Sequence, residues 1–515
     1  MKKILGTQTM RREVLSFTIV IGILITGLTT ASAVGTVPLL TDMTVTDAVE
    51  NELLLDIAVP SHRIDVSTIE GVVTLSGSVD NILVKDRAAR IARVVKGVRA
   101  VVNEIEVNPP ILRTDDQIRE DAESALLYDP ATDAFEVRVR VEDNVVTLSG
   151  TVDSWEEKDL CAKVVKGVKG VKGIDNRIVV AWPEKRSDYE IKTEVEQALK
   201  WDAYIDQGLI DVEVSNAEVK LSGIVGSAAE KSWASIDAYV HGVKSVDNTG
   251  LVVKRWARDE DLKKKKYVKK SPEEVKDAVK DALFYDPRVS SFKIIPYVTK
   301  DGRRVTLRGT VDNLKAKRAA AQDARNTAGV REVENRIKVR PAVLLSDENI
   351  EKRVREALVR DPYLESYEIT VDVRNGVADL YGNVDTAFEK SQADDVVSKV
   401  AGVFTVDNNL VVEKDYDAYI YDPYVDDWYL RDYDWYYHRP RLPTKSDWQI
   451  EKDIKDELFW SPFVDSDDVN VTVEDGVATL TGSVDSWSEY NAAVNNAYEG
   501  GAVYVDNDLT LEWAS

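Results

Sequence analysis

One short segment of alternating hydrophobic and polar residues returns six times along the chain. Its form is Val-x-Leu-x-Gly-x-Val, with Ala in place of the first Val in the last two copies. The copies begin at Val73, Val146, Val219, Val305, Ala378 and Ala478. Their glycines lie 73, 73, 86, 73 and 100 residues apart. This spacing indicates a tandem repeat with insertions in two of its linkers.

The residues that precede each copy predict a helix and then a strand. In the second repeat, residues 114–117 form a capping signature, and the apolar residues of 118–126 follow helical spacing. Residues 135–141 alternate apolar and polar side chains, and a short turn leads into 146–152. This pattern predicts a β-hairpin with one buried face.

The residues that follow each copy predict a second helix and a third strand. In the second repeat the helix begins at Ser154, a good N-cap, and ends at Gly170, which suits a left-handed residue after the last turn. Asn176 lies six residues later, and an Asn recurs there in all six repeats. We expect it to make a structural hydrogen bond. We expect Gly150 to let a helix lie close to the sheet.

The predicted fold class is α+β, with six tandem α-β-β-α-β modules. A parallel crossover joins the second and third strands, so each module is expected to be a three-stranded mixed sheet with two helices packed on one face. Such small units are marginal alone, so neighbouring modules are expected to support each other. The predicted modules span residues 46–108, 114–181, 187–254, 271–340, 346–414 and 446–512, with a Lys-rich linker at 255–270 and a Tyr/Trp/Asp-rich linker at 415–445.

The first 33 residues have the features of an export signal. Four basic residues precede an apolar run at 15–28, and Ala31-Ser32-Ala33 fits a cleavage site. We therefore predict a periplasmic protein that is cleaved after Ala33. The alternative is an uncleaved segment that anchors the chain in the inner membrane.

Charge and composition argue against several classes of function. The formal net charge of −24 disfavours broad nucleic-acid binding, which needs a basic surface. The lone Cys161 occupies a helix position that is alanine in the other five repeats, which indicates an inert buried residue. The three histidines have no metal-ligand spacing. We predict no catalytic residues, metal, cofactor or small-molecule substrate, and hence no enzyme.

The repeated features resemble the BON domain, a module of bacterial envelope proteins. The resemblance rests on the strand Thr147–Val152, the Gly-Val after the second helix and the terminal Asn-x-Ile/Leu-x-Val strand. It implies a non-enzymatic periplasmic protein that is induced by osmotic stress and associated with phospholipid surfaces and envelope integrity. Most members have one to three copies, so six is a departure from the family.

Two second helices are basic against this acidic background. Their candidate lipid-binding residues are Lys85, Arg87, Arg90, Arg93 and Lys96 in the first module and Lys315, Lys317, Arg318 and Arg325 in the fourth. A basic helix face can meet phospholipid headgroups at about 1 kcal/mol per cation. An ordinary solvated helix face is the alternative for each.

The linker at 415–445 is the second candidate for binding. Its candidate partner-binding residues are Tyr421, Tyr424, Trp428, Tyr429, Trp435 and Tyr436. An interfacial belt, a protein-binding segment and a loosely ordered linker all fit this composition, and we favour the protein-binding segment.

Two functional hypotheses follow. In the first, the protein supports the envelope in a chaperone-like role, by binding phospholipid surfaces or folding intermediates of membrane proteins. In the second, it is an extended scaffold that binds envelope proteins with the avidity of six modules.

Overall fold

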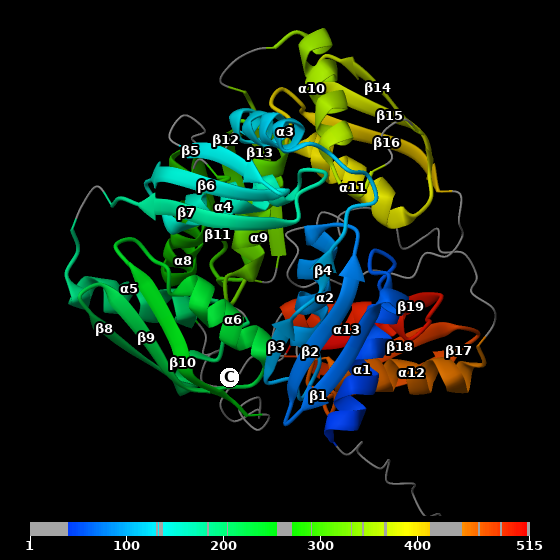
Figure 1. Cartoon of the computed structure of the whole chain (residues 1–515). Helices are drawn as coiled ribbons and strands as arrows, with labels where there is room; N and C mark the ends of the chain where they lie inside the picture. The colour runs from blue at the N-terminus through cyan, green and yellow to red at the C-terminus, as the bar shows by residue number, and fades with distance from the viewer. Residues whose placement is uncertain are drawn as a thin grey trace, which may run out of the picture. The chain divides into compact units, whose positions relative to one another are not determined.

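The computed structural model confirms the predicted fold class. It describes residues 40–129, 132, 137–182, 185–202, 204–254, 270–289, 291–330, 332–341, 345–364, 368–412, 445–461, 464–484 and 487–511. Within these residues the order helix, two strands, helix, strand occurs six times (Figure 1). The first module starts before residue 46, because its first helix begins at Asp42.

The helices of the six modules are of similar length. In module order, the first helices are α1 (Asp42–Leu55), α3 (Asp115–Tyr128), α5 (Asp188–Trp201), α8 (Pro272–Tyr285), α10 (Asp347–Arg360) and α12 (Asp447–Trp460). The second helices are α2 (Ile82–Val94), α4 (Trp155–Lys166), α6 (Ala228–Asp237), α9 (Leu314–Asn326), α11 (Ala387–Ser398) and α13 (Trp487–Glu499).

The strands follow the same order in every module. The first strands are β1 (Ile64–Ile69), β5 (Val137–Glu142), β8 (Ile210–Ser215), β11 (Ile294–Val298), β14 (Ile369–Arg374) and β17 (Val469–Glu474). The second strands are β2 (Val72–Val79), β6 (Val145–Val152), β9 (Glu218–Val225), β12 (Arg304–Val311), β15 (Val377–Val384) and β18 (Val477–Val484). The third strands are β3 (Ala100–Asn103) with β4 (Glu106–Val107), then β7 (Gly173–Val180), β10 (Ser245–Val253), β13 (Glu332–Val339), β16 (Thr405–Val412) and β19 (Tyr504–Leu511). Short 3₁₀ turns, η1 (Ser61–Arg63), η2 (Gln207–Leu209) and η4 (Ser291–Lys293), precede β1, β8 and β11.

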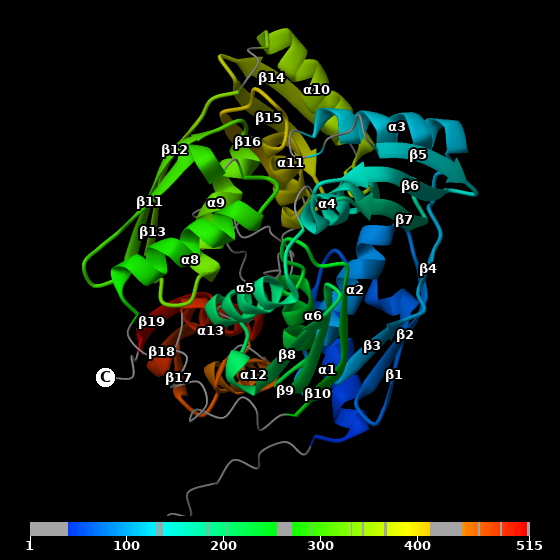
Figure 2. The same ribbon diagram turned by 90° about the vertical axis from the view of Figure 1, so that its left-hand side faces the viewer.

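Each sheet is mixed, as the sequence predicts. The first and second strands pair antiparallel, and the second and third pair parallel, so the second strand is central. In module 2, Leu148 of β6 lies opposite Val139 of β5 and Asn176 of β7. The two helices of a module contact its sheet and each other (Figure 2). The parallel crossover requires a connecting helix, which the second helix supplies.

The hairpin turn is held by an aspartate that sequence patterns alone do not reveal. The carboxylate of Asp115, at the first position of α3, accepts the backbone N–H groups of Asp143 at 3.0 Å and Asn144 at 2.9 Å. Both turn residues have positive φ. The same bonds recur at Asp42, Asp188, Asp347 and Asp447. Module 4 has Pro272 at this position.

The recurrent asparagine makes the structural hydrogen bond that we expected. The side chain of Asn176 donates to the carbonyl of Lys158 in α4 at 2.9 Å and accepts the N–H of Ile178. The side chains of Asn103, Asn335 and Asn408 donate to equivalent helix carbonyls. This bond ties the third strand to the second helix of the same module.

The strand glycine has a different role from the one expected. We predicted that it lets a helix lie close to the sheet, but a Cβ on Gly77 would overlap the carbonyl oxygen of Arg63, which directly precedes β1. Gly223, Gly309, Gly382 and Gly482 meet equivalent carbonyls. These five glycines also have positive φ. The glycine therefore makes room for the entry of the first strand.

The hydrophobic cores are small and mostly separate. Modules 3, 4, 5 and 6 each have a cluster built around their own buried residues, whereas the clusters of modules 1 and 2 are continuous. Val73, Leu75 and Leu148 are fully buried in that shared cluster. Modules 1 and 2 thus support each other through a shared core, as expected for units of this size.

Candidate functional site

In α2 the cation in the middle of the predicted basic face, Arg87, is buried inside the protein. Arg87 is only 4% exposed, and its Nε donates to the carboxylate of Asp56 at 2.7 Å. Asp56 is the C-cap residue of α1, so this buried ion pair joins the two helices of module 1. The guanidinium also lies 5.0 Å from the ring centre of Phe388 in α11.

The other candidates in α2 are partly buried. Lys85, Arg90 and Arg93 are half-buried. The ammonium of Lys96, just beyond the helix, lies 4.3 Å from the ring centre of Phe459 in α12. This face of α2 is therefore directed towards other modules as well as towards solvent.

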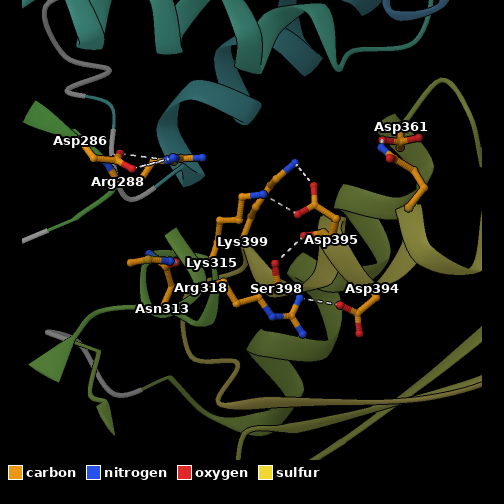
Figure 3. Close-up of polar contacts among 12 residues, drawn as sticks. Asp286, Arg288, Asn313, Lys315, Arg318, Asp361, Asp394, Asp395, Ser398 and Lys399 are labelled. Atoms are coloured by element: carbon orange, nitrogen blue, oxygen red, sulfur yellow. Dashed lines mark hydrogen bonds and ion pairs between the residues drawn. The ribbon is translucent and has the colours of Figure 1, made fainter. Parts of the chain in front are cut away.

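In α9 two of the predicted cations form ion pairs with the neighbouring module. Lys315 is 8% exposed and lies 2.8 Å from Asp395 of α11, and Arg318 lies 2.6 Å from Asp394 (Figure 3). Lys399 reaches Asp395 from one helical turn later, at 2.5 Å. The result is a buried charge network between modules 4 and 5.

The two aspartates of this network differ in their electrostatics. Burial by itself would raise the pKa of Asp395, but Lys315 and Lys399 hold it well below its usual range. Burial raises the pKa of Asp394, since its ion pair with Arg318 does not offset the loss of water and the neighbouring Asp395 charge adds to the rise. Asp395 therefore keeps its negative charge to lower pH than Asp394 does.

The remaining candidates of module 4, Lys317 and Arg325, are half-buried. None of the nine candidate cations has an exposed side chain, although all nine lie in the described part of the chain. Lipid binding by these residues stays a prediction. The six aromatic candidates of the linker, from Tyr421 to Tyr436, fall outside the described residues.

An exposed aromatic patch in module 4 was missed by the sequence interpretation. Phe292 in η4 is 91% exposed and makes an edge-to-face contact with Phe284 of α8, which is 52% exposed. Ile295 and Tyr297 of β11 are also exposed. The signal in the sequence is positional: the residue two before the first strand is aromatic in modules 2, 4 and 5, as Phe135, Phe292 and Tyr367, but is His62, Gly208 or Asp467 in modules 1, 3 and 6.

The groups with catalytic potential are placed unfavourably for chemistry. Cys161 is fully buried, and burial raises the pKa of its thiol to about 12, so the reactive thiolate is suppressed. Within the described ranges no cluster of His, Cys, Asp and Glu could hold a metal ion. The same residues contain no helix that is long and apolar enough to cross a membrane.

Comparisons with known proteins identify the type of module. The chain is a tandem-repeat protein whose units are small α+β modules, and a family model described as "BON domain" matches residues 41–109, 114–181, 187–255, 272–341, 346–414 and 446–512. These segments make up well over half of the chain. The chain therefore belongs to the BON domain family.

One curated relative and two solved structures are similar to parts of the chain. Osmotically-inducible protein Y of Escherichia coli K12 is 32% identical over 141 residues, which cover 26% of this chain and 70% of that protein. A structure of CdsD, a structural protein of the Type III secretion system of Chlamydia trachomatis, covers 44% of this chain and 93% of its own at 17% identity and a TM-score of 0.12. Its C-terminal domain covers 42% of this chain and 100% of its own at 13% identity, again with a TM-score of 0.12. At such scores neither structure adds to the argument.

Proposed function

We propose that this chain is a non-enzymatic protein of the bacterial cell envelope that acts in the periplasm and protects the envelope under osmotic stress by binding phospholipid surfaces. The observation that carries the proposal is the similarity of a two-module length of chain to Osmotically-inducible protein Y. The signal-like residues 1–33 support export. Six copies of one module give repeated contact with an extended surface.

The exposure and the ion pairs of the candidate residues indicate which of them could contact a phospholipid surface. Arg87, Lys315 and Arg318 are already in ion pairs, so their charges are largely compensated inside the protein. The aromatic patch of Phe284 and Phe292 offers apolar side chains that can enter the headgroup region. Half-buried cations such as Lys85, Arg93 and Lys317 would add about 1 kcal/mol each near an anionic surface.

Vesicle co-sedimentation tests the proposal. We expect the full chain to sediment with vesicles of phosphatidylethanolamine and phosphatidylglycerol. The Phe284→Ser/Phe292→Ser variant should lose most of this binding, because about 1.5–3 kcal/mol of transfer free energy accompanies each buried aromatic or aliphatic side chain. The Lys85→Gln/Arg93→Gln/Lys317→Gln variant should lose binding chiefly at low salt.

A matched control keeps the result specific. Leu112 is an exposed apolar residue in a linker between modules, so Leu112→Ser should leave sedimentation unchanged. If the parent chain fails to sediment at low salt, or if Leu112→Ser is as damaging as the Phe substitutions, phospholipid binding by this surface is refuted.

The second candidate function is a multivalent scaffold for envelope proteins or for folding intermediates of membrane proteins. The observation that favours it is the number of exposed apolar residues on the open sheet faces, such as Ile69, Val179 and Val411. Deleting residues 415–445 separates the two candidates. Protein capture through the aromatic linker should disappear in a pull-down, whereas vesicle binding through module 4 should remain.

A further inference from the structure

Three backbone hydrogen bonds of one type join the modules in pairs. In each bond the donor is a backbone N–H just after a second helix, on the residue that precedes the glycine there. The acceptor is the carbonyl of the last residue of the first helix in another module. The bonds run from Lys96 to Trp460 at 3.0 Å, from Lys169 to Arg360 at 2.7 Å and from Ala328 to Trp201 at 2.8 Å. They join module 1 with 6, module 2 with 5 and module 4 with 3. The six modules thus form three nested pairs.

A cation over an aromatic ring accompanies each of these bonds. Lys96 lies 4.3 Å from the ring centre of Phe459, Arg353 lies 4.7 Å from that of Tyr128, and Lys270 lies 3.6 Å from that of Trp201. Each ring belongs to the last turn of a first helix. We call this last turn, together with the glycine turn after a second helix, the pairing surface. Its repeated use in three pairs indicates a specific way in which these modules dock.

One sequence position near the pairing surface distinguishes the outer pair, modules 1 and 6, from the two inner pairs, modules 2 and 5 and modules 3 and 4. The eleventh residue of the first helix is alanine in modules 2 to 5, at Ala125, Ala198, Ala282 and Ala357. It is glutamate in modules 1 and 6, which are partners. The two side chains, Glu52 and Glu457, face each other within hydrogen-bonding reach across the junction of modules 1 and 6. A hydrogen bond between two carboxyl groups requires a proton on at least one of them.

The surroundings of this carboxyl pair favour its protonated form. Glu457 is 8% exposed and Glu52 is half-buried. The charged groups that face Glu52 are Glu499 of α13 and Asp56 at the end of α1, and those that face Glu457 are Asp453 and Asp456 of α12. These four groups are acidic, and Asp56 is paired with Arg87. Lys96 lies over Phe459, and Lys445 is bonded to Asp453 at 2.7 Å.

We propose that Glu52 and Glu457 form a proton-dependent latch, which holds modules 1 and 6 together while a proton is shared and releases them when both carboxyl groups ionise. Two adjacent carboxylates in a poorly solvated junction repel each other strongly. Release would uncover the side chain of Trp460, which packs against the shared core of modules 1 and 2. The alanine-containing inner pairs have no such group and stay closed.

The direction of the pH dependence follows from proton linkage. Burial and then the neighbouring carboxylates raise the pKa of both groups, that of Glu52 from 4.5 to about 8. Because the closed state binds protons more tightly than the open state, closure is most favourable below the ordinary pKa near 4.5. It weakens as the pH rises towards the raised pKa values, about 8 for Glu52 and about 9 for Glu457, and changes little beyond them. Alkaline conditions therefore open the outer pair.

Distance measurements between spin labels test the latch in the full chain. Labels at Met43→Cys and Trp448→Cys report on the outer pair, since both residues are exposed, and Cys161→Ala removes the native thiol. We expect one narrow distance distribution at pH 5 and a longer population whose ratio to the closed one rises about tenfold for each pH unit between pH 6 and pH 8. Labels at Leu127→Cys and Val359→Cys on modules 2 and 5 should show no change.

Substitution of the carboxyl groups makes the result decisive. The neutral variant Glu52→Gln/Glu457→Gln retains hydrogen-bonding capacity and should stay closed at every pH. Conversely, Ala125→Glu/Ala357→Glu should transfer the pH dependence to the pair of modules 2 and 5. A parent chain that stays closed up to pH 9 overturns the latch, as does a glutamine variant that opens like the parent.

Discussion

Helices α2 and α9 have similar basic sequences, yet the cations that face inward from them form ion pairs with different parts of the protein. Arg87 of α2 binds Asp56 inside module 1, whereas Lys315 and Arg318 of α9 bind Asp395 and Asp394 across the junction with module 5. The difference teaches that the net charge of a helix does not tell whether its cations meet solvent, their own module or a neighbour. Burial and the position of the acidic partner decide it.

The largest effect is expected from breaking the internal pair. Arg87→Met should lower the free energy of unfolding by about 3–5 kcal/mol, because Asp56 stays buried without its ionic partner. Both side chains are 5% exposed, so water cannot replace the lost interaction. Urea denaturation with hydrogen exchange should show faster exchange in α1 and α2.

A paired substitution sharpens this expectation. Arg87→Met/Asp56→Asn removes both charges and should recover much of the lost stability. An Arg87→Met chain as stable as the parent would show that the ion pair contributes nothing to the stability of module 1. The proposed difference between α2 and α9 would then be wrong.

A smaller effect is expected from the junction of modules 4 and 5. Lys315→Met should cost about 2 kcal/mol, since Lys399 still neutralises Asp395. Faster hydrogen exchange should be confined to α9 and α11 and should spare the sheet of β11, β12 and β13. Exchange that spreads through module 4 instead would mean that Lys315 stabilises its own module, as Arg87 does.

The pH dependence of this junction runs opposite to that of the latch. Lys315 and Lys399 depress the pKa of Asp395, so its contribution is fully present above the ordinary pKa of 3.8 and is lost only as the pH falls below that value. The junction of modules 4 and 5 should therefore hold at neutral and alkaline pH. If the melting temperature falls between pH 6 and pH 9 and the fall is the same in the Asp395→Asn variant, a titratable group other than Asp395 causes it.

Much of the module could be predicted from the sequence, because its signals are local and repeated. Capping residues such as Ser154 and the glycine after the second helix lie within a few residues of the structure that they stabilise, and Asn176 could be found because an asparagine recurs at its position in every repeat. The repeat also supplied its own control, since alanine at five of six equivalent positions identified Cys161 as a core residue.

The remaining features depend on contacts that no local pattern encodes. Asp115 holds a turn 28 residues away, and Lys315 meets Asp395 at a separation of 80 residues. Glu52 faces Glu457, and Trp460 accepts a hydrogen bond from Lys96, so both contacts join the two ends of the chain. Comparison of equivalent positions across the six repeats would have revealed Glu52 and Glu457 as unusual, because the other four modules have alanine there.

The smallest effect is expected at a lysine that α2 and α9 share. Lys85 and Lys317 occupy equivalent positions, and the backbone carbonyl of each accepts the side chain of the recurrent asparagine. Because that bond uses the main chain, Lys85→Gln and Lys317→Gln should each change the free energy of unfolding by less than about 0.5 kcal/mol. Thermal denaturation measures this directly. A loss above about 1 kcal/mol at either site would show that the ammonium group itself stabilises the module, and this lysine would then belong with Arg87 and Lys315 rather than with the cations available to a ligand.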